Sequence, residues 1–181
     1  GAEPSVEPVL CDRCGMFSAQ PRFVRFRSVI GLLRRVRERL HEGVFCRVCA
    51  DRVAIRASLT TWLLGWWSLP DGPRRALLAI LGNLSGGEKP VDRNARLLSR
   101  QARAFHAQGR KELAAGLALQ ANDFRYDAAL EPIIAEGGGR RLRDRWRVGG
   151  VAFVVQALPV GLAVAWPLTW IGRRVLWLVT G

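Results

Sequence analysis

The chain contains two short cysteine motifs, Cys11-Asp12-Arg13-Cys14-Gly15 and Cys46-Arg47-Val48-Cys49-Ala50, and no cysteine outside them. Two residues between paired thiolates allow a tight turn that aims both sulfurs at one ion, while backbone N–H groups help to stabilise the charge. Two such turns brought together supply four thiolates, a tetrahedral set that suits zinc and leaves no position for a reactive water. The spacing therefore predicts a closed, structural Zn²⁺ site made of Cys11, Cys14, Cys46 and Cys49.

Paired cysteines also occur in disulfides, in dithiol redox motifs and in iron–sulfur sites. A thioredoxin-like motif needs one pair in a βαβ context, which the flanking sequence does not show. The first ten residues carry acids and prolines in place of the basic and apolar stretches of a secretory signal. We therefore expect a reducing compartment and free thiolates, and keep a dithiol oxidoreductase only as an alternative.

Composition narrows the class of protein further. The chain has 181 residues, 28 basic and 15 acidic side chains, a net charge of +13 and 49% hydrophobic residues. A disordered basic tail is excluded by the apolar content, and a large multi-domain enzyme by the length. The charge favours a negatively charged partner, either phospholipid or nucleic acid. No metalloprotease, serine-hydrolase or P-loop motif is present, so we predict that the protein is not an enzyme.

Changes in composition divide the chain into six segments. They are a polar leader (1–10), a four-cysteine module with Trp-rich apolar helices (11–84), a Gly-containing linker (85–90), a helical hairpin (91–136), a basic collar (137–147) and an apolar segment (148–181). In the module, Phe, Val and Arg alternate over 21–30, which favours a strand. Residues 32–40 fit either a helix or a second strand, and 52–69 and 74–81 are predicted helices. The predicted fold class is α+β: a small zinc-ribbon-like module followed by mainly helical segments.

Several motifs of this module resemble a family of uncharacterised bacterial proteins with four cysteines. The first motif is the C-x2-C-G of Cys11–Gly15. The others are Phe26-Arg27, Gly43-Val44-Phe45-Cys46, Thr61, Gly65-Trp66-Trp67 and Asn83-Leu84. The resemblance covers residues 11–84, and the chain departs from the pattern at Ser68, where the family has a further Gly. It implies a zinc-ribbon-like module, often in membrane-associated proteins, and no known activity.

A tryptophan-rich run follows the second cysteine motif. Trp62, Trp66 and Trp67 lie within an apolar stretch, 59–69, that is too short to cross a bilayer. The indole ring suits both a small protein core and the headgroup boundary of a membrane. We therefore expect these tryptophans either to pack over the cysteine motifs or to lie in a membrane surface.

The segment 91–136 is predicted to begin with two antiparallel helices, 91–108 and 110–124, joined at Gly109. The positions Ala102, Phe105, Gly109, Ala114 and Ala121 are similar to a single tetratricopeptide unit, although Gln101 stands where a Leu is expected. One unit cannot bury its own apolar face. It must pack on the zinc module, on a second copy or on a protein partner. His41 and His106 are interpreted as surface residues.

The C-terminal region carries an uncharged stretch, 148–172, long enough for a hydrocarbon core of roughly 30 Å. Five arginines precede this stretch and two, Arg173 and Arg174, follow it, which predicts that the zinc module lies on the cytoplasmic side. The boundary tryptophans are Trp146, Trp166 and Trp170. Because Pro159 and Pro167 each remove a helix donor, a re-entrant hairpin is an alternative to a single span.

Together these features predict a non-enzymatic, membrane-anchored zinc protein, an adaptor or scaffold whose segment 91–136 binds a protein or a second copy. The alternative is a nucleic-acid-binding zinc ribbon that uses Phe23, Phe26 and the arginines of 22–39, because cations bind phosphate and exposed rings stack on bases. The arginines expected to meet anionic lipid or nucleic acid are Arg22, Arg25, Arg27, Arg34, Arg35, Arg37, Arg39, Arg140, Arg141, Arg143, Arg145 and Arg147.

Overall fold

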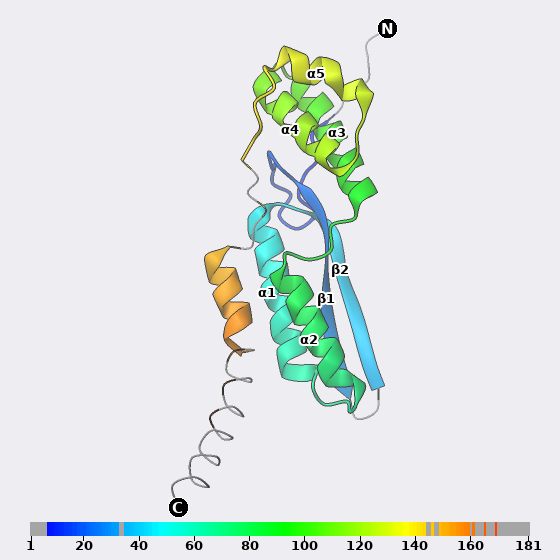
Figure 1. The fold of residues 1–181 in the computed structure, drawn as a ribbon, viewed down its shortest axis with the longest axis vertical. Coiled ribbons are helices and arrows are strands. Elements are labelled where there is room, and N and C mark those ends of the chain that lie inside the picture. Colours follow the sequence, from blue (N-terminus) through cyan, green and yellow to red (C-terminus); the bar gives the residue numbers. More distant parts are fainter. Residues whose placement is uncertain are drawn as a thin grey trace, which may run out of the picture.

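The computed structural model describes residues 7–32, 35–143, 146, 149–159, 161, 165 and 169. It has a mixed α+β fold. A long antiparallel hairpin, β1 (Arg22–Leu32) and β2 (Arg35–Phe45), is covered by α1 (Arg47–Leu64) and α2 (Asp71–Leu84) (Figure 1). One end of this layer carries a helical unit made of α3 (Val91–Ala107), α4 (Lys111–Phe124), a 3-10 turn (Ala128–Leu130) and α5 (Glu131–Glu136). A further helix over 150–159 lies beside α1.

The strand predicted over 21–30 is confirmed, and the undecided stretch 32–40 belongs to a second strand. The register runs from Arg22 opposite Phe45 to Leu32 opposite Arg35. Val24 and Phe26 of β1 are buried in the core that also contains residues of α1. The backbone N–H and C=O groups of such a strand need hydrogen-bond partners, and β2 supplies them along one edge. The apolar residues of 32–40 have helical spacing, but pairing with β1 overrides it.

Two buried asparagines cap the outer edge of β1, where a third strand would otherwise pair. Asn83 of α2 accepts a hydrogen bond from the Arg27 N–H through Oδ1 (3.0 Å) and donates to the Arg27 carbonyl through Nδ2 (2.8 Å). Asn94 of α3 makes the same pair of bonds with the backbone of Phe23 (2.9 and 2.9 Å). Each amide reproduces the donor and acceptor of a neighbouring strand, so the edge is satisfied without further pairing.

Two further positions on the outer edge of β1 also have partners. The hydroxyl of Thr61 in α1 accepts from the Val29 N–H (2.9 Å). The backbone of Glu88 exchanges two hydrogen bonds with Arg25, both 2.9 Å. The segment predicted as a linker, 85–90, therefore lies along β1. Thr61 and Asn83, two of the motif residues in this module, act on the strand edge and not on the cysteines.

The tryptophan run lies at the opposite end of α1 from the cysteines, so the expectation that it packs over them is wrong. Cys46 immediately precedes α1, and 18 residues of helix separate it from Gly65, which is about 27 Å at 1.5 Å per residue. The helix ends at Leu64, five residues earlier than expected. There the α1–α2 loop packs so closely on β1 that a Cβ on Gly31 would lie 3.0 Å from the Gly65 carbonyl oxygen and from Ser68. The small side chain of Ser68 is buried in this contact.

The helical hairpin is confirmed, and it packs on the cysteine module. Phe17, which follows the first cysteine motif, meets Phe105 of α3 edge to face with 5.3 Å between ring centroids. Gln101, the exception to the repeat pattern, is fully buried; it accepts from the Val9 N–H (2.7 Å) and donates to the Ser18 carbonyl (3.0 Å). The sequence did not predict the 3-10 turn or α5, which cover the hairpin through Leu130 and Ile133, respectively.

We expect Gln101→Leu to lower the stability of the folded chain by about 1–3 kcal/mol, although it restores the repeat pattern. Leucine leaves the Val9 N–H and the Ser18 carbonyl without their side-chain partner at a buried position. Chemical denaturation measures the effect. Gln108→Leu, an exposed change at the end of the same helix, is the control, and equal stability of the two variants would contradict the role assigned to Gln101.

The predicted apolar segment is described only in part. Residues 150–159 form a helix whose buried side chains, Ala152 and Gln156, face α1, and Ser58 of α1 donates to Gln156 Oε1 (2.7 Å). This part of the expected span therefore packs on protein along one face. In the described portion of the chain, no helix has the length and apolar character to cross a bilayer. Arg34, Arg145, Arg147, Trp166, Trp170 and most of 160–181 lie outside the described residues.

Candidate metal centre

The first cysteine turn is held against the end of β2. Cys11 donates its backbone N–H to the Met16 carbonyl (3.0 Å) and accepts from Gly15 (2.9 Å), which closes a tight loop. Asp12 ties this loop to the strand: its N–H donates to the Val44 carbonyl (2.9 Å), and its Oδ2 accepts from the Val44 N–H (2.6 Å). Asp12 therefore fixes the position of the two neighbouring sulfurs relative to β2.

The second cysteine turn is the start of α1. Cys46 occupies the N-cap position, and Cys49 lies in the first helical turn, where the free N–H groups and the helix dipole favour negative charge. The Cys46 N–H also reaches across to the other turn and donates to Cys11 Sγ (3.3 Å). The N-terminus of α1 thus supplies both a pair of ligands and an electrostatic environment that suits thiolates.

The two turns bring all four sulfurs together. The Sγ atoms of Cys11, Cys14, Cys46 and Cys49 lie within 4.8 Å of one another, and the Cys14 and Cys46 sulfurs are 3.9 Å apart. Four sulfurs at about 2.3 Å from a zinc ion would be about 3.8 Å from one another, close to this arrangement. All four are free thiols, and 3.9 Å is far beyond the roughly 2.05 Å of a disulfide. The cluster is a four-sulfur ligand set for one metal ion.

The pKa values of the clustered thiols are consistent with a site that binds a cation. Burial raises the pKa of Cys11, but hydrogen bonds from the backbone of Cys46, Cys14 and Arg13 outweigh burial and lower it to about 7. Burial raises the pKa of Cys49 to about 12, and the neighbouring thiols add to the effect. Burial also raises the pKa of Cys46. The backbone therefore stabilises the thiolate of Cys11. Further thiolates in the cluster would repel it, and a bound divalent cation would offset that repulsion.

The cluster is part of the main core of the module. Cys11 and Cys49 are buried with Val24, Phe26 and Phe45 of the strands, together with small residues of α1. Trp146, expected at a membrane boundary, is instead 8% exposed in this core, and its indole N–H donates to the Gln20 carbonyl (2.8 Å). A flat apolar ring with one satisfied donor is well suited to such a site. The chain that leads to 150–159 is thus fixed on the metal module.

The arginines of β1 do not form the free basic stripe that the sequence suggested. Arg22 is buried, donates to Gln120 Oε1 (2.9 Å) and lies over the Phe124 ring. Arg25 pairs with Glu42 (2.8 Å). Phe26 is buried, so it is not available to stack on a base. Arg25 thus has a partner on the neighbouring strand and Arg22 has one on α4. The local sequence pattern does not reveal either partner.

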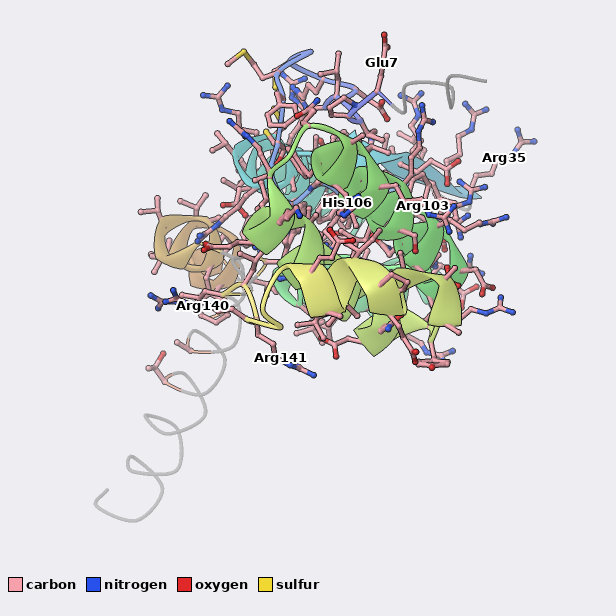
Figure 2. All side chains as sticks on the ribbon, turned by 90° about the horizontal axis from the view of Figure 1, so that it is seen from above. Glu7, Arg35, Arg103, His106, Arg140 and Arg141 are labelled. Atoms are coloured by element: carbon pink, nitrogen blue, oxygen red, sulfur yellow. The ribbon has the colours of Figure 1, made fainter. Side chains whose placement is uncertain are left out.

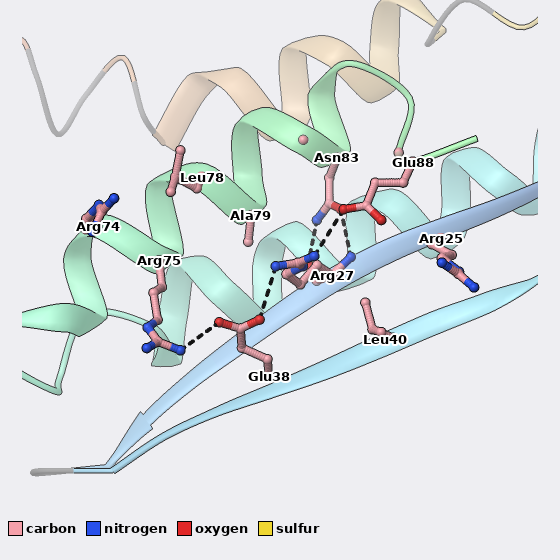
Figure 3. Close-up of a pocket in the computed structure, with 12 residues that line it drawn as sticks. Arg25, Arg27, Glu38, Leu40, Arg74, Arg75, Leu78, Ala79, Asn83 and Glu88 are labelled. Atoms are coloured by element: carbon pink, nitrogen blue, oxygen red, sulfur yellow. Dashed lines mark hydrogen bonds and ion pairs between the residues drawn. The ribbon is translucent and has the colours of Figure 1, made fainter. Parts of the chain in front are cut away.

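Arg27 is the centre of an ion-pair network in a groove between α2 and the sheet (Figure 3). It contacts Glu38 (3.2 Å) and Glu88 (3.0 Å), and Glu38 also contacts Arg75 (3.1 Å). The groove has a volume of about 420 Å³, and an apolar wall of leucine and alanine side chains accompanies these charges. Because carboxylates already pair with Arg27 and Arg75, the network holds α2 on the sheet.

The described arginines of the basic collar are exposed and lie against the turn between α3 and α4. Arg140, Arg141 and Arg143 line an open groove of about 830 Å³ together with Arg110 and Lys111, which the sequence did not single out. Arg141 also pairs with Asp123 (3.1 Å). Figure 2 shows Arg140 and Arg141 on the opposite side of the molecule, in this view, from Arg35 and Arg103. Positive charge is therefore spread over the surface and not gathered on one face.

The three tryptophans of the predicted membrane run have different environments. Trp62 and Trp66 are half-buried, whereas Trp67 is 70% exposed. The exposed positions nearest to it in sequence, Leu63, Leu64 and Leu69, are also apolar. Of the three, only Trp67 presents most of its ring to solvent.

Comparison with models of protein families, with curated proteins and with solved structures finds no match for this chain. The resemblance to a four-cysteine family therefore stays a prediction from the motif residues.

Proposed function

We propose that this protein is a non-enzymatic zinc protein of the membrane surface, in which a closed four-thiolate site stabilises a module that acts as an adaptor or scaffold. The observation that carries the proposal is the cluster of four sulfurs within 4.8 Å of one another. Zinc matches a set of four thiolates, and a site with four protein ligands supports folding and leaves no coordination position for catalysis.

Membrane anchoring is supported by residues 148–172, which carry no charge, and by the arginines on both sides of them. The excess of arginines on the N-terminal side favours the cytoplasm for the metal module, where thiols stay reduced. The partner surface is proposed on α3. Arg93, Arg96, Arg100 and Arg103 recur there at helical spacing on an exposed face, which suits an acidic protein segment.

Fractionation of cells expressing the full chain tests the membrane part of the proposal. We expect the protein in the membrane pellet, with release by detergent and not by high salt. The variant Val164→Glu with Leu168→Glu is the control and should stay in the soluble fraction, because each charge placed in the hydrocarbon core of a bilayer costs about 2.5–3.5 kcal/mol. Wild-type protein that stays in the soluble fraction without detergent would contradict anchoring.

Metal analysis and thiol titration of the detergent-purified protein test the metal part. We expect one zinc ion per chain and four thiols that react with a colorimetric reagent only after a chelator is added. A dithiol oxidoreductase would instead expose one reactive pair without a chelator and cycle between thiol and disulfide. Metal-free protein that retains its fold would contradict the proposal.

A further inference from the structure

The end of α1 farthest from the cysteines carries a projecting apolar surface. Leu63 is 64% exposed, Trp67 70% and Leu69 76%, and the exposed Leu64 lies between them in sequence. We call these four residues the apolar tip. Their exposed fractions show that much of each apolar side chain is open to solvent. Exposed apolar clusters of this kind mark contacts with proteins or membranes.

Three N–H groups at and beside the tip have partners within the loop, whereas the indole N–H of Trp62, one residue before the tip, is buried without one. The Trp67 indole N–H donates to the Leu63 carbonyl (2.8 Å), the Gly65 N–H to the Thr61 carbonyl (2.7 Å) and the Gly72 N–H to the Ser68 carbonyl (2.6 Å). An exposed tryptophan in water would bond to solvent equally well. The internal bond matters in an apolar environment, because the indole ring can move out of water while its N–H stays hydrogen-bonded.

The helix over 150–159 extends the apolar surface toward the same end. Asp51 of α1 lies beside Gly149, and Ser58 bonds to Gln156, so the helix runs parallel to α1. Its exposed side presents only apolar side chains: Val151, Phe153, Val154, Val155 and Leu158. The helix over 150–159 therefore runs alongside α1 in the direction of the tip, as Figure 1 shows for the helix drawn in orange, and the C-terminal membrane contact would begin beyond this helix.

Exposed arginines lie at the same end of the molecule as the tip. Gly31 packs on the α1–α2 loop, which brings the start of β2 to this end of the molecule with its exposed Arg35 and Arg37. The first turn of α2 adds Arg74. Of the nearby acids, Asp71 is exposed, and Glu38 is neutralised by Arg27 and Arg75. An apolar centre with a basic rim matches the acyl chains and phosphates of an anionic bilayer.

We propose that the apolar tip inserts into the interface of a bilayer that contains anionic phospholipid, as a second membrane contact besides the C-terminal segment. The inference rests on the proposed membrane location of the protein. A bilayer is favoured over a protein partner because exposed apolar side chains and exposed arginines occur together at this end of the molecule, the combination that acyl chains and anionic headgroups bind. Insertion of both contacts would hold α1 in a defined orientation relative to the membrane.

Photo-crosslinking of the full zinc-loaded chain in vesicles tests the proposal. The photoreactive residue p-benzoylphenylalanine replaces Leu63 or Leu69, one at a time, in vesicles of phosphatidylglycerol and phosphatidylcholine. Val48 is the matched control, since it is an apolar position of the same helix with 59% exposure at the cysteine end. We expect lipid adducts from positions 63 and 69 and only background from position 48. Adduct yield should fall in vesicles of phosphatidylcholine alone.

Flotation of the same vesicles separates the possible failures. Chains that float but give no lipid adduct at 63 and 69, or equal adducts at 48, overturn the inference and leave the proposed function intact. Crosslinks to protein instead of lipid would overturn the inference and would indicate that the tip binds a protein partner or a second copy of the chain. Chains that do not float overturn both. Zinc content of each variant confirms that it has folded.

Discussion

Replacing Cys49 with serine is expected to abolish stoichiometric zinc binding and to unfold the cysteine module. Cys49 is buried in the same core as Val24, Phe26 and Phe45, so loss of the metal also disrupts the packing of α1 on β1. Structural zinc contributes about 10–16 kcal/mol in zinc-finger peptides, as much as the whole stability of a typical domain, about 5–15 kcal/mol. Metal analysis and circular dichroism during heating measure the two effects.

The control for this variant is Met16→Ser, an exposed position in the loop of the first cysteine turn. It should keep its zinc and its melting temperature. The helical unit has a separate core around Leu98, Phe105 and Leu117, so part of the helical signal should survive in Cys49→Ser. A Cys49→Ser protein that holds one zinc ion per chain and melts like the wild type would exclude a structural role for the cluster.

The second large effect is expected from Asn83→Ala, which should lower the free energy of unfolding by about 2–5 kcal/mol. The change removes the side-chain partner of both the N–H and the carbonyl of Arg27, at part-buried positions, and one of the two partners of the buried Ser58 hydroxyl. Each buried group left unpaired costs about 1–3 kcal/mol. Chemical denaturation at saturating zinc gives the difference.

Two further variants make this prediction specific. Asn83→Asp keeps the acceptor for the Arg27 N–H but loses the donor to its carbonyl, so it should fall between the wild type and alanine. Asn122→Ala removes a single hydrogen bond, to the Asp127 N–H, at a half-buried position and should cost about 1 kcal/mol. If Asn83→Ala costs no more than Asn122→Ala, Asn83 is not a structural cap of β1.

Local patterns were sufficient for the metal ligands and for most elements. A C-x2-C turn is set by neighbouring residues, so the two cysteine pairs could be recognised without knowledge of the fold. The strand over 21–30 and the two helices around Gly109 likewise follow from the spacing of their apolar residues. The stretch 32–40 could not be assigned in this way, because its identity as β2 depends on β1 lying opposite.

The sequence was least informative about the arginines and tryptophans. Arg22 and Arg27 look like members of one basic stripe, yet the first is buried against Gln120 and the second pairs with Glu38 and Glu88. Trp146 lies in the metal module, whereas Trp67 is exposed. A side chain's type indicates what it can bind, but its partners lie far away in sequence and only the fold brings them near.

By itself, the sequence of this protein determined that four thiols are available at spacings suited to one metal ion, because such turns are built from adjacent residues. It also determined that the helical hairpin forms, because its apolar period is local. Only the tertiary structure decided that the two cysteine turns meet, that Asn83, Asn94 and Thr61 bond to the edge of β1, and that the apolar tip lies at the opposite end of α1 from the cysteines. These features depend on contacts between residues distant along the chain, and a one-dimensional pattern does not encode their geometry.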